Sequence, residues 1–162
     1  MTDTETDFEL LAAQLDALLG DEPDALANTA NMVALVWQAM SQINWAGVYV
    51  LRGKELVLGP FQGNPACVRI PLGKGVCGTA AAKRHTLRVA DVHEFAGHIA
   101  CDAASRSELV VPLMRDGIVL GVLDIDSPIE NRFSQRDQDG IELLCDRFIA
   151  QLARRPFKAP FI

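Results

Sequence analysis

The sequence predicts an α+β domain in which helices pack on a mainly antiparallel sheet of about six strands. Helical apolar periodicity occupies both ends of the chain, whereas short strands and hairpin turns fill the middle. Hairpins join neighbouring strands in antiparallel order, while parallel pairs need long crossovers. With 162 residues, 49% of them hydrophobic, the chain can bury one core, so we expect a single layered domain over residues 1–162.

Two helices are expected before the first strand. Apolar residues recur at helical spacing from Phe8 to Leu19, and Gly20 ends this helix. A second apolar stripe runs from Asp24 to about Ile43. Such stripes are typical of helices that pack on a core, so we assign both helices a structural role.

The expected strands are short apolar segments bounded by turn residues: 46–51, 56–61, 67–71, 87–90, 109–114 and 118–126. Asp116-Gly117 is a strong signal for a hairpin between the last two strands. The glycine-rich segment 73–78 opens a short helix that ends near Arg84. Residues 91–106 show no clean period, and long irregular segments in compact domains tend to be functional.

A final helix is predicted from Ser134 to about Arg154. Ser134 caps it, and Asp137, three residues later, completes a capping box. We expect the acidic segment 1–7 and the tail 155–162 to be loosely ordered.

Charge and composition exclude several classes of partner. The chain carries 21 acidic and 15 basic residues, a formal net charge of −6, which argues against nucleic acids and anionic membranes. The N-terminus lacks the pattern of a signal peptide, and no apolar run has membrane-spanning length. We therefore expect the cytoplasm, where thiols are kept reduced.

The four cysteines divide into two groups. Cys145 lies within the apolar face of the final helix and is interpreted as a buried packing residue. Cys67, Cys77 and Cys101 lie in the loop-rich middle, where a partner can reach a thiolate. Cys77 also lies at a helix start, where the helix dipole lowers a thiol's pKa. These three residues indicate a thiol–disulfide redox centre.

Three carboxylates are expected to converge. Asp124 and Asp126 alternate with Ile125 on one strand, so both aspartates face away from the core. Glu108 begins the strand paired through the Asp116-Gly117 turn and can approach the same end of the sheet. Together they fit a cationic group such as an α-ammonium. The alternative is that they are solvated charges at strand ends.

A metal site competes with the thiol interpretation. Sulfur and imidazole ligands are available from Cys67, Cys77, Cys101, His93 and His98. None of the usual close cysteine or histidine spacings of structural zinc sites occurs, so we expect no metal. The segment Gly73-Lys74-Gly75 lacks the rest of a phosphate-binding loop.

Several segments resemble known motifs. Residues 70–81, 89–92, 120–126 and 133–137 are similar to those of GAF domains, most of which are ligand-binding sensors. Residues 44–49, 59–63 and 107–112, together with the three central cysteines, resemble the stand-alone GAF enzymes that reduce free methionine-(R)-sulfoxide. The resemblance covers about residues 30–154 and implies a GAF-like fold with this reductase activity.

The resemblance also implies roles for individual cysteines. Cys101 would be the nucleophile that becomes a sulfenic acid, Cys67 the principal resolving thiol and Cys77 an auxiliary thiol. Thioredoxin would be the reductant, with no metal or organic cofactor. Cys145 lies outside the family pattern.

The pocket residues follow from the same resemblance. Glu108, Asp124 and Asp126 would bind and polarise the substrate, and Trp45 would wall the methyl end. Two other functions stay open: a GAF sensor that binds a small ligand without turnover, and a regulator switched by oxidation of Cys101. The oligomeric state also stays open, with a homodimer as one expectation.

Overall fold

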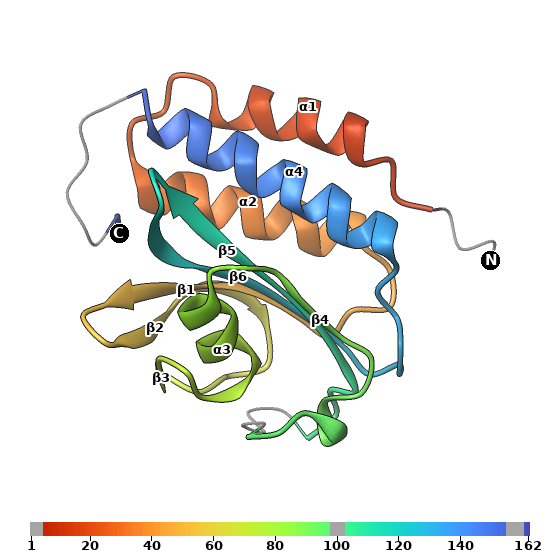
Figure 1. The fold of residues 1–162 in the computed structure, drawn as a ribbon. Helices are drawn as coiled ribbons and strands as arrows, with labels where there is room; N and C mark the ends of the chain where they lie inside the picture. The colour runs from red at the N-terminus through yellow and green to blue at the C-terminus, as the bar shows by residue number, and fades with distance from the viewer. Residues whose placement is uncertain (1–4, 98–102, 155–160) are drawn as a thin grey trace.

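A six-stranded antiparallel sheet divides the molecule into two layers (Figure 1), with the strand order β3-β2-β1-β6-β5-β4. The strands are β1 (Trp45–Arg52), β2 (Glu55–Gly63), β3 (Arg69–Pro71), β4 (Leu87–Val89), β5 (Ser107–Arg115) and β6 (Ile118–Ser127). This computed structural model describes residues 5–97, 103–154 and 161–162. The predicted α+β class with a six-stranded antiparallel sheet is confirmed.

Three helices cover one face of the sheet, namely α1 (Phe8–Leu19), α2 (Ala25–Ala39) and α4 (Gln135–Leu152). Helices α2 and α4 pack on the sheet and α1 packs on these two helices, and their apolar stripes form the larger hydrophobic core with alternate residues of β1, β5 and β6. The predicted capping box at Ser134 and Asp137 is present at the start of α4. Cys145 is buried in this core, as its place in the apolar pattern indicates.

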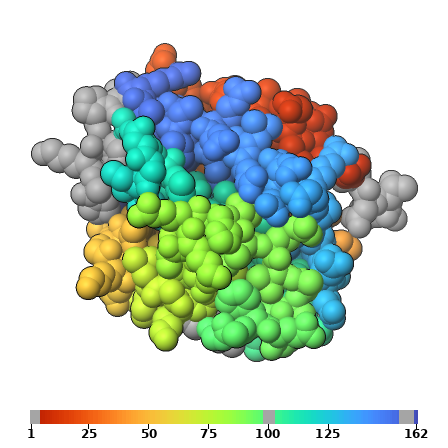
Figure 2. Space-filling view, viewed as in Figure 1, coloured from red at the N-terminus to blue at the C-terminus, as the bar shows by residue number. Residues whose placement is uncertain are grey.

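The opposite face carries the short helix α3 (Gly75–Lys83) and a smaller hydrophobic cluster. A 3-10 turn, Val92–Glu94, begins the segment that follows β4. Figure 2 shows the side chains of α3 and the following segment filling the surface below the helix layer. This α3 face is where the central cysteines and carboxylates were expected.

Strand alternation divides the residues of β6 between the two faces as predicted. Leu123 and Ile125 are fully buried in the helix-side core, and Asp124 between them belongs to the other face. The hairpin with β5 turns at Asp116 and Gly117, both of which have positive φ angles, 51° and 76°. Two successive positive φ angles match the strand twist of a tight hairpin.

Two predicted boundaries are wrong. Helix α2 ends at Ala39 rather than near residue 43, because Met40 already has an extended backbone with φ −95° and ψ 122°. Strand β3 begins at Arg69 rather than at Cys67, so Cys67 lies in the connection before it. Apolar composition continued beyond the hydrogen-bonded segment in both cases, and such boundaries are the least predictable feature of an element.

The C-terminal residues 161–162 lie against the helix side of the sheet. Phe161 is buried and meets Phe148 edge-on, with 6.2 Å between ring centroids. The Ile162 carbonyl accepts a 2.7 Å hydrogen bond from Arg52. Within the described residues, none of the helices is both long enough and apolar enough to cross a bilayer.

Candidate active site

Three carboxyl groups from neighbouring strands meet on the α3 face. Glu108 of β5 lies opposite Asp126 of β6, and Asp124 is two residues before Asp126 on the same strand. Glu108 is 6% exposed and Asp124 5% exposed, while Asp126 is partly exposed. The alternative of solvated strand-end charges is therefore wrong for Glu108 and Asp124.

Helix α3 places Cys77 against these carboxyls. The Cys77 Sγ lies 3.7 Å from Glu108 Oε1, within hydrogen-bond reach of a thiol. One ligand atom from each of Cys77, Glu108 and Asp124 lies within 4.8 Å of the others. Gly78 allows the start of α3 to pack closely on the end of β3, because a Cβ at that position would collide with the Pro71 carbonyl.

Burial makes the carboxyls reluctant to ionise. Desolvation raises the pKa of Glu108 well above its usual range, and the charges of Asp124 and Asp126 raise it further. Desolvation also raises the pKa of Asp124, to about 6. These effects favour the protonated form of Glu108, in which the carboxyl can donate a hydrogen bond. Buried Asp124 Oδ1 finds no hydrogen-bond donor among the described residues, so it can receive one from a ligand.

The expectation that a helix N-terminus lowers the pKa of Cys77 is wrong. Burial raises this pKa well above its ordinary value, and the charges of Asp124 and Glu108 raise it further. The dipole of a nine-residue helix contributes less than complete desolvation beside carboxylates. Cys77 is thus a thiol rather than a thiolate in this environment.

Aromatic rings line the β1 side of the site. Trp45 lies opposite Asp126 in the β1–β6 register and is 2% exposed. Its ring stacks on Tyr49 and Phe61, with centroids 5.8 and 5.4 Å away, and its Nε1 donates a 3.0 Å hydrogen bond to the Asn64 carbonyl. These contacts hold the indole in one orientation as a rigid wall.

Gly47 leaves the space that this indole fills. The residue lies opposite Asp124, and a Cβ there would collide with the Trp45 ring and crowd Phe61. A larger residue would therefore displace the indole from the carboxyl-bearing strand.

Cys67 lies at the edge of the same region. It is partly exposed and disulfide-bonded, whereas Cys77 and Cys145 are free thiols. The Tyr49 hydroxyl donates a 2.9 Å hydrogen bond to the Cys67 carbonyl and so ties the β2–β3 connection to the centre of the sheet. Cys101, and His98 of the rejected metal set, fall outside the described residues.

The described ends of segment 91–106 are fastened to each other. Val92 N donates a 2.7 Å hydrogen bond to the Arg106 carbonyl, and the Arg106 guanidinium pairs with Asp91 at 3.2 Å. The same guanidinium reaches Glu130, beyond β6, at 2.9 Å. This arrangement, called the Arg106 clamp below, anchors the segment on which Cys101 lies in the sequence.

The structure thus brings Trp45, Cys77, Glu108, Asp124 and Asp126 to one face, with Cys67 at its edge. Sequence reasoning assigned no role to Tyr49, Gly47 or Arg106. Tyr49 and Arg106 contact partners that are 15 or more positions away in the sequence. Local sequence patterns therefore give little indication of their roles.

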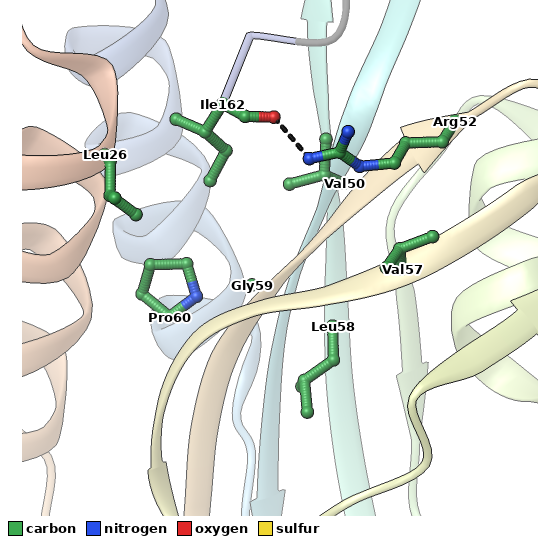
Figure 3. Close-up of a pocket in the computed structure, with 8 residues that line it drawn as sticks. All are labelled: Leu26, Val50, Arg52, Val57, Leu58, Gly59, Pro60 and Ile162. Carbon is green, nitrogen blue, oxygen red and sulfur yellow. Dashed lines mark hydrogen bonds between the residues drawn. The ribbon is translucent and has the colours of Figure 1, made fainter.

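A second cavity lies on the helix side of the sheet, away from these groups. It encloses about 430 Å³ beside α2, β1 and β2, and Figure 3 shows its eight lining residues. Among the described residues its walls are mostly aliphatic, and Arg52, the one charged residue of this lining, is hydrogen-bonded to the Ile162 carbonyl. The described lining therefore lacks the acids and thiols that redox chemistry needs.

Comparisons with known proteins identify the family of this chain. A family model described as GAF domain matches residues 27–148. The free methionine-R-sulfoxide reductase of Escherichia coli is 49% identical over 151 residues, covering 93% of this chain and 92% of that protein. The enzyme of the same name from Saccharomyces cerevisiae is 43% identical over 145 residues, covering 85% of this chain and 81% of that protein.

A solved structure extends the likeness to three dimensions. The structure of fRMsr of Staphylococcus aureus in complex with substrate has 51% sequence identity and a TM-score of 0.89, covering 94% of this chain and 99% of that one. The matches span nearly the whole of both chains, so fold and family are shared. The chain belongs to the GAF domain family and, within it, to the family of the free methionine-R-sulfoxide reductases.

Proposed function

We propose that this protein reduces free methionine-(R)-sulfoxide to methionine through cysteine chemistry on the α3 face. The observation that carries the proposal is the cluster of three carboxyls, the buried Glu108 and Asp124 and the partly exposed Asp126, beside the stacked Trp45. Burying an ionised acid costs free energy unless the acid is paired or hydrogen-bonded, and a cationic ligand can supply that pairing. A zwitterionic amino acid with a polar sulfoxide supplies both a cation and an oxygen that needs a proton.

Substrate binding follows from the two kinds of carboxyl. The α-ammonium would donate to Asp126 and to the unpartnered Oδ1 of Asp124 by charge-assisted hydrogen bonds. The S-methyl group would lie against the Trp45 indole, since that ring is apolar and held in place. Glu108 would donate its proton to the sulfoxide oxygen.

The redox step would transfer oxygen from substrate to enzyme. The Cys101 sulfur attacks the polarised sulfoxide, a bond forms between this sulfur and the sulfoxide oxygen as the substrate's sulfur–oxygen bond breaks, and methionine departs as the thioether. The proton lost by the Cys101 thiol replaces the one that Glu108 donates to the oxygen. Cys101 is left as a sulfenic acid, oxidised by two electrons. The Cys67 thiol then condenses with it, forming a disulfide and releasing water.

Recycling would need an external dithiol. We assign this role to thioredoxin in the cytoplasm, which would open the disulfide by exchange and leave itself oxidised. Support comes from the cysteines that are described: Cys67 is in a disulfide, while Cys77 and Cys145 are free. Cys77, buried and protonated, would serve as a reserve thiol.

The decisive experiment compares methionine formation from four substrates in the presence of thioredoxin. We expect turnover of the free R epimer only, with the free S epimer and both N-acetylated epimers far slower. Acylation removes the ammonium charge and leaves the buried carboxylates unpaired, which typically costs several kcal/mol.

Two outcomes would contradict the proposal. Equal efficiency on free and N-acetylated R epimers would remove the ammonium from the carboxyl cluster. Saturable binding of the free R epimer without any methionine formed, even in one equivalent, would instead favour a GAF sensor.

A further inference from the structure

Cys77, Glu108 and Asp124 together form a compact set of sulfur and oxygen ligands. One ligand atom from each residue lies within 4.8 Å of the other two, and all three residues are buried. Asp124 is only 5% exposed, and its Oδ1 accepts no hydrogen bond from any of the described residues. A buried carboxylate oxygen that meets no donor can bind a cation instead.

The spacing also suits tetrahedral coordination. Zinc bonds of about 2.3 Å to sulfur and 2.0 Å to oxygen separate two such ligands by about 3.5 Å. The Cys77 Sγ and Glu108 Oε1 are 3.7 Å apart, so this edge is nearly correct without movement. The distances from the Asp124 ligand atom to those of Cys77 and Glu108 are within 4.8 Å. Rotation of the carboxyl groups would shorten them.

We propose that Cys77, Glu108 and Asp124 bind one thiophilic divalent cation, Zn²⁺ or Cd²⁺, and that the bound ion occupies the place of the substrate's ammonium. The site would discriminate against Mg²⁺ and Ca²⁺, because those ions prefer all-oxygen sets of higher coordination number. The overlap with substrate rests on the proposed function, whereas metal binding itself does not.

The metal is an inhibitor here rather than a cofactor. Metal binding releases the protons of Cys77 and Glu108 to solvent, and the three resulting negative ligands more than balance the two charges of the cation. The metal then occupies Glu108 and Asp124, the groups assigned to proton donation and ammonium binding. Partly exposed Asp126, beside Glu108 in register, offers a route to solvent and a fourth oxygen ligand.

The disulfide form of the protein isolates the site. In that form Cys67 is bonded and the free thiols are Cys77 and Cys145, so thiol titration checks the sample before metal is added. Cd²⁺ binding is then followed by thiolate-to-metal charge-transfer absorption and by calorimetry, with Zn²⁺ competition and Mg²⁺ as the negative ion.

We expect one Cd²⁺ per chain with charge-transfer absorption. Cys77→Ser should abolish the absorption, and Asp124→Asn should weaken binding at least about tenfold, the scale seen when metal-site groups are lost. Cys145→Ser is the matched control and should bind as the unaltered protein does. Retained absorption in Cys77→Ser, or its loss in Cys145→Ser, would overturn the site.

A last measurement separates this inference from the proposed function. Saturating free methionine-(R)-sulfoxide should weaken Cd²⁺ binding to the disulfide form, because both occupy the same carboxyls. If Cd²⁺ binding requires Cys77 but its affinity is unchanged by the sulfoxide, the metal site is supported and the shared pocket is contradicted. Absence of Cd²⁺ binding together with normal reductase activity would overturn the metal site alone.

Discussion

The two faces of the sheet use the same strands for opposite purposes. On the helix side, β6 contributes Leu123 and Ile125, both fully buried in the larger core. On the α3 side the alternate positions are Asp124 and Asp126, with Glu108 on the neighbouring strand. The first arrangement stabilises the fold. The second lowers the stability, because it buries acids whose charged form is disfavoured there.

The two free cysteines sharpen this contrast. Cys77 is 4% exposed and Cys145 3% exposed, and in both thiols burial is the main cause of a raised pKa. The remaining causes differ: Asp124 and Glu108 act on Cys77 from inside the site, whereas Asp146 and Glu142 act on Cys145 from its own helix. Equal burial therefore does not mean equal role, and substitutions on the two faces can test the difference.

The largest effect is expected on the proposed thiol relay. Cys101→Ser should release no methionine, even in a single turnover, because no sulfenic acid can form. Cys67→Ser should release about one equivalent, since attack on the substrate precedes disulfide formation, and then recycle poorly with thioredoxin. Quantifying methionine per enzyme under single-turnover conditions checks both. One full equivalent from Cys101→Ser would remove it from the nucleophile role.

Glu108→Gln should be the next most severe change. Loss of the proton donor is expected to lower kcat by about 10²–10⁴-fold. Because the pKa of Glu108 is raised, activity should be present while it is protonated and fall as the pH rises through that pKa. The pH profile of the variant should lack this basic limb. Exposed Glu9 of α1 provides the control, since Glu9→Gln should leave the profile unchanged.

Asp124→Asn should separate stability from activity. Its raised folded pKa of about 6 means that the unfolded chain loses this proton first, so the native state is penalised as the pH rises from about 4 towards 6 and beyond. Above pH 7 the variant should therefore have a free energy of unfolding that is higher by roughly 1–3 kcal/mol, and it should unfold at a higher urea concentration. Its catalytic efficiency should fall at the same time.

The opposite face supplies the comparison for that variant. Leu123, the residue before Asp124, is fully buried in the larger core. Leu123→Ala should therefore lower the free energy of unfolding by about 2–5 kcal/mol. A destabilised Asp124→Asn at pH 8 would contradict the desolvation argument. Urea unfolding of both variants at pH 5 and pH 8 gives the required free energies.

A smaller effect is expected from opening the Arg106 clamp. Arg106→Ala removes the ion pairs to Asp91 and Glu130 and should lower kcat about tenfold through misplacement of the segment that carries Cys101. Stability should change by less than about 1 kcal/mol, because these pairs are partly exposed. Arg106→Lys should restore part of kcat with KM unchanged.

The matched control for the clamp lies in the helix layer. Arg147 pairs with Asp16 at 3.0 Å, with comparable exposure, between α4 and α1. Arg147→Ala should therefore alter stability as little as Arg106→Ala does, while kcat stays unchanged. Equal kcat values for the two alanine variants would show that the Arg106 clamp has no positioning role.

Cys145→Ala should have the smallest effect on activity. Removing a buried sulfur from the helix-side core should cost about 1–3 kcal/mol of stability while turnover stays within about twofold. Cys77→Ala, on the other face, should slow recycling of the Cys67→Ser variant further, because it removes the reserve thiol. Steady-state assays with thioredoxin and thermal melts of the same samples check both statements.

Much of the fold could be predicted because its signals are local. The Asp116-Gly117 turn adopts the two positive φ angles that only a few residue types tolerate, and Ser134 and Asp137 form the capping box read from their spacing. Element ends were less predictable, as α2 and β3 show. An apolar residue just outside a helix or strand has the same chemistry as one inside, and hydrogen bonding to distant strands decides between them.

The sequence by itself determined which side chains share a face. Strict alternation along β6 separates Leu123 and Ile125 from Asp124 and Asp126, and the hairpin turn brings Glu108 into register with them. Only the tertiary structure decided what each group experiences there. Cys77 sits at a helix start, yet its pKa rises, because desolvation and neighbouring carboxylates depend on groups brought from other strands. The environment of a side chain depends on residues that are distant in the sequence. For Cys77, the effects of burial and of neighbouring charges on the pKa exceed the effect of its own helix.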